Sequence, residues 1–467
     1  MSDNSFMDRD AYIKQLENEI VQLKKRIEEL ERLLGMNSQN SSRPPSSDPP
    51  GAPAVIFSRK RRKKRGAKYG HQPHLRELLP QEFVKQHFHL KPDVCACGST
   101  NFKDTNEEPL RHQFVDIPPI EPEVIEYVQH IYRCRDCGEL VYQPLPDEVR
   151  RKHFGPGVLA TVGILTGKLN TSKRKALAML NEVFSVPMSL GGLSNCEAQL
   201  TDVLEQPYHE TGEHVREQDE AHADETGWRK GNLQKGWLWV LCCTTAAFFM
   251  VHANRSQKAA RKLIGSFNGK LVTDRYNSYN FYTLIRQICW AHLKRDFQAI
   301  SEAKDAIGKI GRELHGLAKK ILKLRKRVRD GTLQWKTFQR RMPELQKRVE
   351  SLLKAGANFD GKMGGKCRDI LKHKKHLWTF VQNQRVEPTN NFAERIVRQG
   401  VLWRKSSFGT QSERGARYVE RILTVCATCR LQGRSVIEYL RDACRCHLNG
   451  IPAPSLIKPA GSLAKSA

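Results

Sequence analysis

Acidic residues at three separate places in the chain could together bind divalent metal ions. Asp224 lies in EAHADETGW, Asp274 ends GKLVTD, and Glu394 lies in TNNFAERIVRQG. Mg²⁺ takes carboxylate oxygens as ligands, and two such ions a few Å apart activate an attacking water or 3′-OH and stabilise the departing oxygen. We therefore expect these three carboxylates to bind Mg²⁺ (or Mn²⁺), as a pair of ions.

The residue types alone leave other roles open for each acid. Asp274, at a strand end, could instead make a turn or cap a helix. Glu394 could form an i,i+4 surface pair with Arg398. Three acidic neighbours of Asp224 could be the ligand in its place: Asp219, Glu220 and Glu225.

Paired cysteines, each pair followed by glycine, predict a second and different metal site. The sequence is Cys-Ala-Cys-Gly in the first pair and Cys-Arg-Asp-Cys-Gly in the second, and the residues are Cys95, Cys97, Cys134 and Cys137. Glycine allows the tight turn that points amide groups at the thiolates. Four thiolates leave no open position, so we expect structural Zn²⁺ in a zinc-ribbon-like module; the alternative is two buried knuckles without metal. A later set mimics a second zinc site: Cys426, Cys429, Cys444 and Cys446, with His447. Cys426 and Cys429 fall in a helical pattern, so we expect them to be core thiols, with metal binding as the alternative.

The segments that must position the acids alternate between strand and helix. Residues 220–228, 236–243 and 246–254 are rich in aromatic and β-branched side chains and predict three consecutive strands. A helix over 255–267 and a fourth strand over 269–274 follow, and residues 283–300 predict another helix. This order matches the opening of a ribonuclease-H-like sheet, in which the first and fourth strands are neighbours. The expected fold class is therefore α/β, with Asp224 and Asp274 side by side.

Helical and basic segments surround this sheet. Residues 154–206 predict short helices joined by turns, which resemble a helix-turn-helix DNA-binding region. Residues 301–385 hold 23 Lys and Arg against 8 Asp and Glu, a net charge of +15, and predict a helical insertion. We expect this insertion to contact nucleic acid; a solvated helix pair is the alternative.

The N-terminal segment has the pattern of a coiled coil. Isoleucine and leucine recur every seven residues, at Ile13, Ile20, Ile27 and Leu34 and at Leu16, Leu23 and Leu30. This pattern favours a parallel homodimer, or a higher multimer, over a helix docked on its own chain. A Ser- and Pro-rich linker follows, and then seven consecutive cations expected to bind phosphates: Arg59, Lys60, Arg61, Arg62, Lys63, Lys64 and Arg65.

Composition limits the classes of protein to which the chain can belong. The 467 residues carry a net charge of +28, and 39 % are hydrophobic. The longest mostly apolar stretch, residues 237–251, is 15 residues, shorter than the ~20 of a membrane-spanning helix. No apolar leader begins the chain, and 13 cysteines in short pairs favour a reducing compartment. We expect a cytoplasmic, nucleoid-associated protein whose partner is a polyanion, with no membrane.

Several blocks together resemble the transposases of the IS66 insertion-sequence family, which are DDE-type enzymes. The resemblance extends from about residue 13 to about 440, and its blocks are NSSRPPSSD (40–48), the cysteine knuckles, HADETGW (222–228), VTDRYNSY (272–279), CWAHLKRDF (289–297), NNFAERIVR (390–398) and WRKSSFGTQSERGA (403–416). It implies that Asp224, Asp274 and Glu394 form a metal-binding triad. It also implies that the preceding region binds the element's inverted-repeat ends, and that accessory proteins from the same element could take part.

Residues near these acids have expected supporting roles. His292 follows Cys289 by three residues on one helix face. It could lie near the metals, or hold half a metal site together with Cys289, although a packed core pair is the more common arrangement. Trp290 could stack on a flipped base, but a core position is the more common arrangement. Five further cations are expected to bind DNA: Lys294, Arg295, Arg398, Arg404 and Lys405.

The expected organisation and function follow from these elements. The expected divisions are 1–36 (coiled coil), 37–90 (linker), 91–150 (zinc-ribbon-like), 151–212 (helical), 213–300 with 386–425 (catalytic core), 301–385 (insertion) and 426–467 (C-terminal helical region). The leading hypothesis is a transposase that binds terminal inverted repeats and target DNA and carries out Mg²⁺-dependent phosphodiester hydrolysis and strand transfer. The alternatives are an inactive zinc-containing DNA-binding regulator and an RNA-processing nuclease of the same fold.

Overall fold

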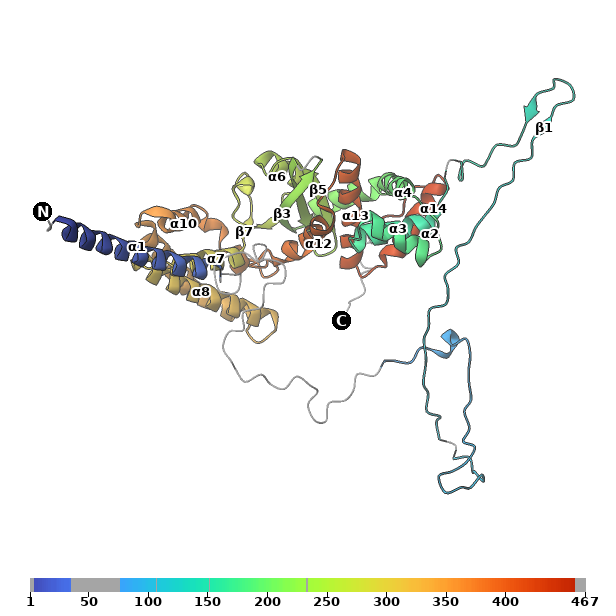
Figure 1. Cartoon of the computed structure of the whole chain (residues 1–467), viewed down its shortest axis with the longest axis horizontal. Helices are drawn as coiled ribbons and strands as arrows, with labels where there is room; N and C mark the ends of the chain where they lie inside the picture. The colour runs from blue at the N-terminus through green and yellow to red at the C-terminus, as the bar shows by residue number, and fades with distance from the viewer. Residues whose placement is uncertain (1–3, 35–75, 106, 151, 232–233, 458–467) are drawn as a thin grey trace. The chain divides into compact units, whose positions relative to one another are not determined.

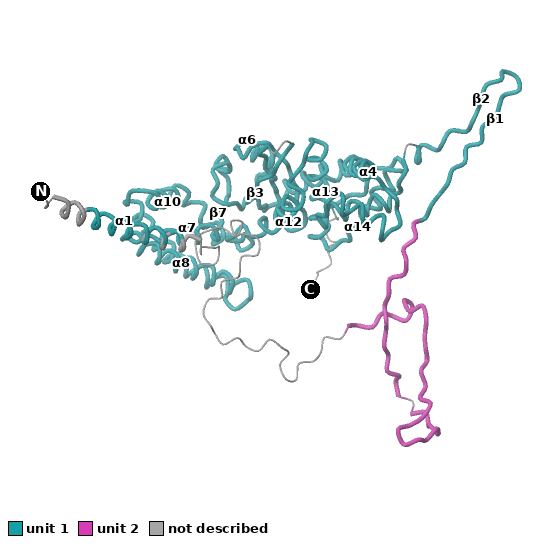
Figure 2. The backbone as a smooth tube through the Cα atoms, viewed as in Figure 1, with its two compact units in different colours: residues 1–55, 123–467 teal, residues 56–122 magenta. Residues whose placement is uncertain are grey.

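The computed structural model describes residues 4–34, 76–105, 107–150, 152–231 and 234–457. It is a mixed α/β structure, about half helical, with one main mixed sheet. The chain divides into two units, residues 1–55 with 123–467 and residues 56–122 (Figure 2). Of the segments before the core, α1 (Asn4–Leu34) is a helix, as its heptads predict, and η2 (Gln81–Phe83) is a short 3-10 helix. The predicted basic run 59–65 lies outside the described residues.

The main sheet contains the four predicted strands and one more. Its strands are β3 (Glu220–Lys230), β4 (Gln234–Cys242), β5 (Ala247–His252), β6 (Lys270–Thr273) and β7 (Arg286–Ile288). Their order is β5-β4-β3-β6-β7, with β3, β4 and β5 antiparallel and β6 and β7 parallel to β3. The first and fourth strands are therefore neighbours, as predicted. The short η4 (Asn277–Tyr279) follows β6.

The prediction of one helix over 283–300 is wrong at its start. Residues 286–288 form the edge strand β7, and α7 (Trp290–Ser301) begins only after Cys289. The strand buries two polar side chains that have tertiary partners. The Arg286 Nε donates to Thr273 Oγ1 at 2.9 Å, and the Gln287 amide oxygen accepts from the Phe380 backbone N–H at 2.9 Å. These partners come from distant segments, so the local helical pattern could not reveal them.

Helices cover both faces of the sheet (Figure 1). On one face lie α12 (Asn391–Ser407) and α13 (Glu413–Leu431); on the other lie α5 (Glu205–Arg216) and α6 (Gln257–Ile264). Alternation along β3 explains this division, because Trp228 faces the first layer while Ala221 and Ala223 face the second. The helix α6 begins at Ser256, whose hydroxyl accepts from the Ala259 N–H.

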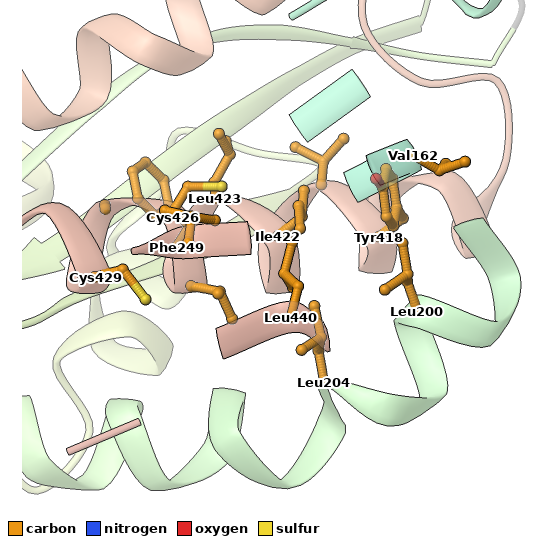
Figure 3. Close-up of a cluster of buried hydrophobic side chains, with 14 of the residues drawn as sticks. Val162, Leu200, Leu204, Phe249, Tyr418, Ile422, Leu423, Cys426, Cys429 and Leu440 are labelled. Atoms are coloured by element: carbon orange, nitrogen blue, oxygen red, sulfur yellow. The ribbon is translucent and has the colours of Figure 1, made fainter. Parts of the chain in front are cut away.

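The largest core joins helices from both ends of the described unit (Figure 3). The helices before the sheet are α2 (Pro156–Val162), the π-helical η3 (Gly163–Lys168), α3 (Lys173–Glu182) and α4 (Leu190–Val203), close to the predicted ranges. They pack against α13 and α14 (Val436–Leu448). A Cβ at Gly167 would lie 2.3 Å from Ile422 Cγ1, so glycine permits the close approach of η3 to α13. The helix α13 runs without interruption through the expected division at 425/426.

The insertion is helical, as predicted. It contains α8 (Ala306–Arg329), α9 (Trp335–Ala357), α10 (Gly361–Lys372), η5 (Lys374–His376) and α11 (Thr379–Gln382). Its apolar faces form a separate core with α7. Exposed cations of α8 include Lys309, Arg312, Lys319, Lys320, Lys323 and Lys326, whereas Arg325 of the same helix is buried. Within the described residues, no carboxylate lies within ion-pair distance of these six cations.

Candidate active site

Strand pairing places Asp224 and Asp274 together at one end of two neighbouring strands. In the parallel pair β3 and β6, His222 lies opposite Val272. Asp224 and Asp274 each follow two residues later, and Asp274 comes directly after the last residue of β6. Adjacent strands are about 5 Å apart, so the two carboxylates extend from neighbouring points of the sheet. Asp274 also makes a turn, since its Oδ1 accepts from the Tyr276 N–H at 2.9 Å.

Glu394 joins this pair from the first turn of α12, which packs on β3. Its Oε1 lies 3.6 Å from His292 Nδ1, in the first turn of α7. Within the described residues Glu394 forms no ion pair with Arg398, so the surface-pair alternative is not observed. The imidazole of His292 is thus beside the acids, in the position that the spacing of CWAH allowed.

Asp224 lies close to several other carboxylates, and their charges affect its pKa. Burial raises the pKa of Asp224 well above its usual range, and the charges of Glu225, Asp274 and Glu394 raise that pKa further. Such a group of carboxylates is unstable as a set of bare anions. A divalent cation would neutralise them, so the donor set fits hard cations that prefer oxygen ligands.

Glu225, one of the alternatives to Asp224 as a metal ligand, faces the opposite side of the sheet, which α5 and α6 cover. Its carboxylate accepts from Arg255 Nε at 2.8 Å and from the Tyr279 hydroxyl at 2.5 Å. Burial raises its pKa to about 7, while Arg255 lowers it. Because its oxygens are engaged on the opposite side of β3, Glu225 is not placed with the triad. Asp219 precedes the strand, and Glu220 lies 3.4 Å from His222 Nε2.

Asn390 connects the segments that carry the site, although it was not among the predicted site residues. It is fully buried before α12, and its Nδ2 donates to the carbonyl of Ala223 at 2.8 Å. Its Oδ1 lies 3.2 Å from His222 Nδ1, and its backbone N–H donates to Cys289 Sγ at 3.1 Å. One side chain thereby ties β3 beside Asp224 to the helix of Glu394. The two adjacent asparagines that begin NNFAER were the sequence feature that could have indicated this role.

Trp290 occupies the core position that was favoured over stacking on a flipped base. Its ring is fully buried, its Nε1 donates to the Leu377 carbonyl at 2.7 Å, and its ring centroid lies 4.8 Å from that of Trp378. The core alternative is the one observed. Cys289 is also buried, and burial raises its pKa to about 12.

The expected DNA-binding cations fall into two groups. Arg398 and Lys405 are exposed, and Lys294 and Arg295 on α7 are partly exposed. Arg295 is close enough to His292 to lower the pKa of that imidazole, although burial lowers it more. Arg404 differs, because its Nη1 donates to the carbonyl of Gly227 in a structural contact with β3, while its role in DNA binding stays a prediction.

The two cysteine pairs lie in different units, and each forms the expected knuckle by itself. Gly98 and Gly138 have φ of +86° and +74°, which glycine adopts readily. Backbone hydrogen bonds lower the pKa of Cys95 and of Cys134. The backbone of Cys97 has the largest effect on Cys95, and the backbone of Cys137 has the largest effect on Cys134. These amide donors favour thiolates, as a zinc site requires.

The sequence IEPEVIEYVQHIYRC (120–134), between the knuckles, has a pattern that favours extended β structure, but few residues there form strand. Only β1 (Tyr132–Arg133) and β2 (Leu140–Val141) pair, and residues 120–131 have no regular structure. The extended sequence pattern there has no partner strand among the described residues to complete a ladder.

Two of the later cysteines, Cys426 and Cys429, are core residues as expected, whereas Cys446 is only partly buried. Cys426 and Cys429 lie inside α13 in the main core (Figure 3), and Cys444 is buried beside them in the same cluster. In the described part of the chain, the ligand atoms of three potential metal-binding residues converge at one place: Cys289, His292 and Glu394.

Comparison with known families agrees with this arrangement. Residues 151–418 match the model of the family described as Transposase IS66 family. Residues 92–138 match the zinc-finger binding domain of transposase IS66, and residues 5–77 match a family of unknown function (DUF6444).

The curated relatives come from Sinorhizobium fredii and are described as uncharacterized proteins. The chain is 22 % identical to y4hP over 79 % of this chain and 73 % of the relative. It is 21 % identical to y4jD over 78 % and 77 %, and 24 % identical to y4qI over 52 % and 50 %. Their names assign no activity.

Proposed function

This chain belongs to the IS66 transposase family, and we propose that it is an active DNA transposase whose metal ligands are Asp224, Asp274 and Glu394. The observation that carries the proposal is the proximity of the three acids, since the charges of Asp274 and Glu394 both act on the buried Asp224. Two come from the same end of the parallel strands β3 and β6, and the third from α12 packed on β3. The strand order β5-β4-β3-β6-β7 supports a ribonuclease-H-like core.

The proposed reaction is phosphodiester hydrolysis at the ends of the element, followed by attack of the freed 3′-OH on target DNA. Two Mg²⁺ (or Mn²⁺) ions bound by the triad would activate the attacking oxygen and stabilise the departing one. The chain itself supplies the position of the carboxylates, through strand register and through Asn390. Arg295, beside His292, is placed to hold a phosphate of the bound strand.

The remaining parts provide the DNA-binding and assembly functions in this proposal. The exposed cations of α8, together with Lys294, Arg398 and Lys405, would neutralise phosphates of the inverted repeats and of the target. The family match over 92–138 supports structural Zn²⁺ on the four knuckle cysteines. Dimerisation through α1 would bring two ends together. None of the described helices combines the length and apolarity needed to cross a bilayer.

The test is cleavage of a duplex carrying the element's end by the purified full chain with Mg²⁺. Asp224→Asn, Asp274→Asn and Glu394→Gln should each reduce cleavage at least about 10³-fold while end binding persists, because each removes metal-binding charge. The matched control is Glu220→Gln, on the same face of β3 but outside the triad. If wild type and the triad variants bind DNA equally and none cuts, the protein is the inactive regulator instead.

A further inference from the structure

Cys289, His292 and Glu394 bring three different ligand atoms to one point. A thiol sulfur, an imidazole nitrogen and a carboxylate oxygen all lie within 4.8 Å of one another. Cys289 precedes α7, His292 is in its first turn, and Glu394 is in the first turn of α12. Packing of α7 beside α12 thus creates a mixed S, N, O donor set, unlike the all-carboxylate set of the triad.

Two of these atoms have no hydrogen-bond partner among the described residues. His292 Nδ1 and Glu394 Oε1 are both buried atoms, and they lie 3.6 Å apart, too far for a hydrogen bond. Two ligands of one tetrahedral zinc ion are about 3.3 Å apart, from the usual bond length of about 2.0 Å. The gap between the two atoms is therefore close to the separation that a shared ion would produce.

The surroundings of the thiol would favour it as the third ligand once a metal is bound, although burial raises the pKa of the free thiol. The backbone N–H of Asn390 donates to Cys289 Sγ at 3.1 Å, and the sulfur lies at the start of α7. Both features stabilise a thiolate once a metal displaces the proton to solvent. The side chains of His292 and Glu394 remain 35 % and 37 % exposed, which provides an entry path.

We propose that Cys289, His292 and Glu394 form a binding site for a thiophilic divalent cation such as Zn²⁺, with the fourth position open. Because the site uses Glu394, its occupation by Zn²⁺ removes one ligand from the Mg²⁺ triad and inhibits cleavage. The inhibition rests on the proposed function, whereas binding of the cation does not. A sulfur ligand excludes Mg²⁺ in favour of softer ions, so the two metals compete for one carboxylate only.

The test is a Co²⁺ titration of the full chain whose knuckle cysteines have first been saturated with one equivalent of Zn²⁺. Wild type should bind a further equivalent of Co²⁺ with a thiolate-to-cobalt charge-transfer band. Cys289→Ser should lose that band, and His292→Gln should weaken binding about tenfold or more. The controls are Cys367→Ser, a buried thiol of the insertion core, and His315→Gln on α8, which should both titrate as wild type.

Two further variants separate this proposal from the proposed function. Asp224→Asn should abolish cleavage yet bind Co²⁺ as wild type does, whereas Glu394→Gln should lose both. In wild type, Zn²⁺ should inhibit Mg²⁺-dependent cleavage without releasing DNA. The proposal is overturned if Cys289→Ser binds the second Co²⁺ with unchanged affinity and spectrum. It is also overturned if His292→Gln lowers only the melting temperature, which would indicate a simple His–Glu pair.

Discussion

Replacing Asn390 with alanine should loosen the site by separating its strand from its helix. The substitution removes the donor to the Ala223 carbonyl and the partner of His222 Nδ1. Asn390 is fully buried, so water cannot easily replace these bonds. Each buried group left without a partner costs about 1–3 kcal/mol, so Asn390→Ala should cost about 4 kcal/mol. At about 2 °C per kcal/mol for a large domain, the melting temperature should fall by about 8 °C.

The neighbouring asparagine provides the matched control. Asn391 is exposed, and its side chain makes no hydrogen bond within the described structure, so Asn391→Ala should melt within about 1 °C of wild type. The assay is thermal unfolding of both variants followed by tryptophan fluorescence, with Asn390→Asp as a second variant of nearly equal volume. Asp cannot donate to the Ala223 carbonyl, so it should also destabilise the protein.

Activity provides a second measure of the same contact. Ala223 directly precedes Asp224, and Glu394 lies one helical turn after Asn390, so a shift of α12 against β3 changes the separation of the two acids. At a temperature where Asn390→Ala is folded, its cleavage rate should be at least about 100-fold below that of Asn391→Ala. Equal melting temperatures for the two alanine variants would refute the reasoning that Asn390 joins the strand to the helix.

Three further predictions concern packing, ionisation and metal. Gly400→Ala should destabilise the protein by about 1–3 kcal/mol in urea unfolding, because its Cβ would lie 2.2 Å from Leu238 Cδ2. Gly316 has open space around it, so the control Gly316→Ala should be neutral or stabilising. Burial raises the pKa of Glu420 from 4.5 to about 7, so its contribution to stability is present below pH 4.5 and is lost as the pH rises through 7. The Glu420 Oε1 accepts from the Val251 N–H, and a glutamine oxygen can accept the same bond. As the pH rises from 4.5 to 8, the free energy of unfolding of Glu420→Gln, measured in urea, should therefore increase by up to about 3 kcal/mol relative to that of wild type. Parallel pH profiles for the two proteins would contradict this. Chelation of zinc should increase proteolysis of the zinc-finger segment and leave the main thermal unfolding transition unchanged, because none of the knuckle cysteines belongs to the core clusters. A fall in the temperature of that main transition on chelation would contradict this.

The sequence predicted those parts of the fold in which local pattern and final packing agree. The strands β3 to β6 alternate or are continuously apolar, and Ser256 caps α6 as its residue type favours. The positions of Asp224 and Asp274 followed because parallel neighbours share one end of a sheet. The residue types alone did not separate Asp224 from Glu225, which are adjacent in β3. The family resemblance named Asp224, and in the structure Arg255 and Tyr279 engage Glu225.

Other features depend on tertiary partners that no local pattern contains. The strand β7 and the role of Asn390 both depend on polar side chains buried against distant segments. The helix α5 begins within the expected helical division 151–212, but it was not predicted as a separate helix, although its turns bury Tyr208 and Val215 against the sheet. Arg404 resembled a phosphate ligand by charge, but its position on α12 directs it to a strand carbonyl. Charge indicates a residue's possible partners, and packing decides among them.

The pairing of α2 with α14 has a consequence for synthesis of the protein on the ribosome. Leu159 and Val162 emerge early, yet the helix that covers them, with Leu440 and Ala443, is translated more than 270 residues later. Until then the nascent chain exposes an apolar surface and requires protection from aggregation. A copy of the gene interrupted before α14 would therefore yield a polypeptide with an open core, prone to degradation even though all three acids are encoded.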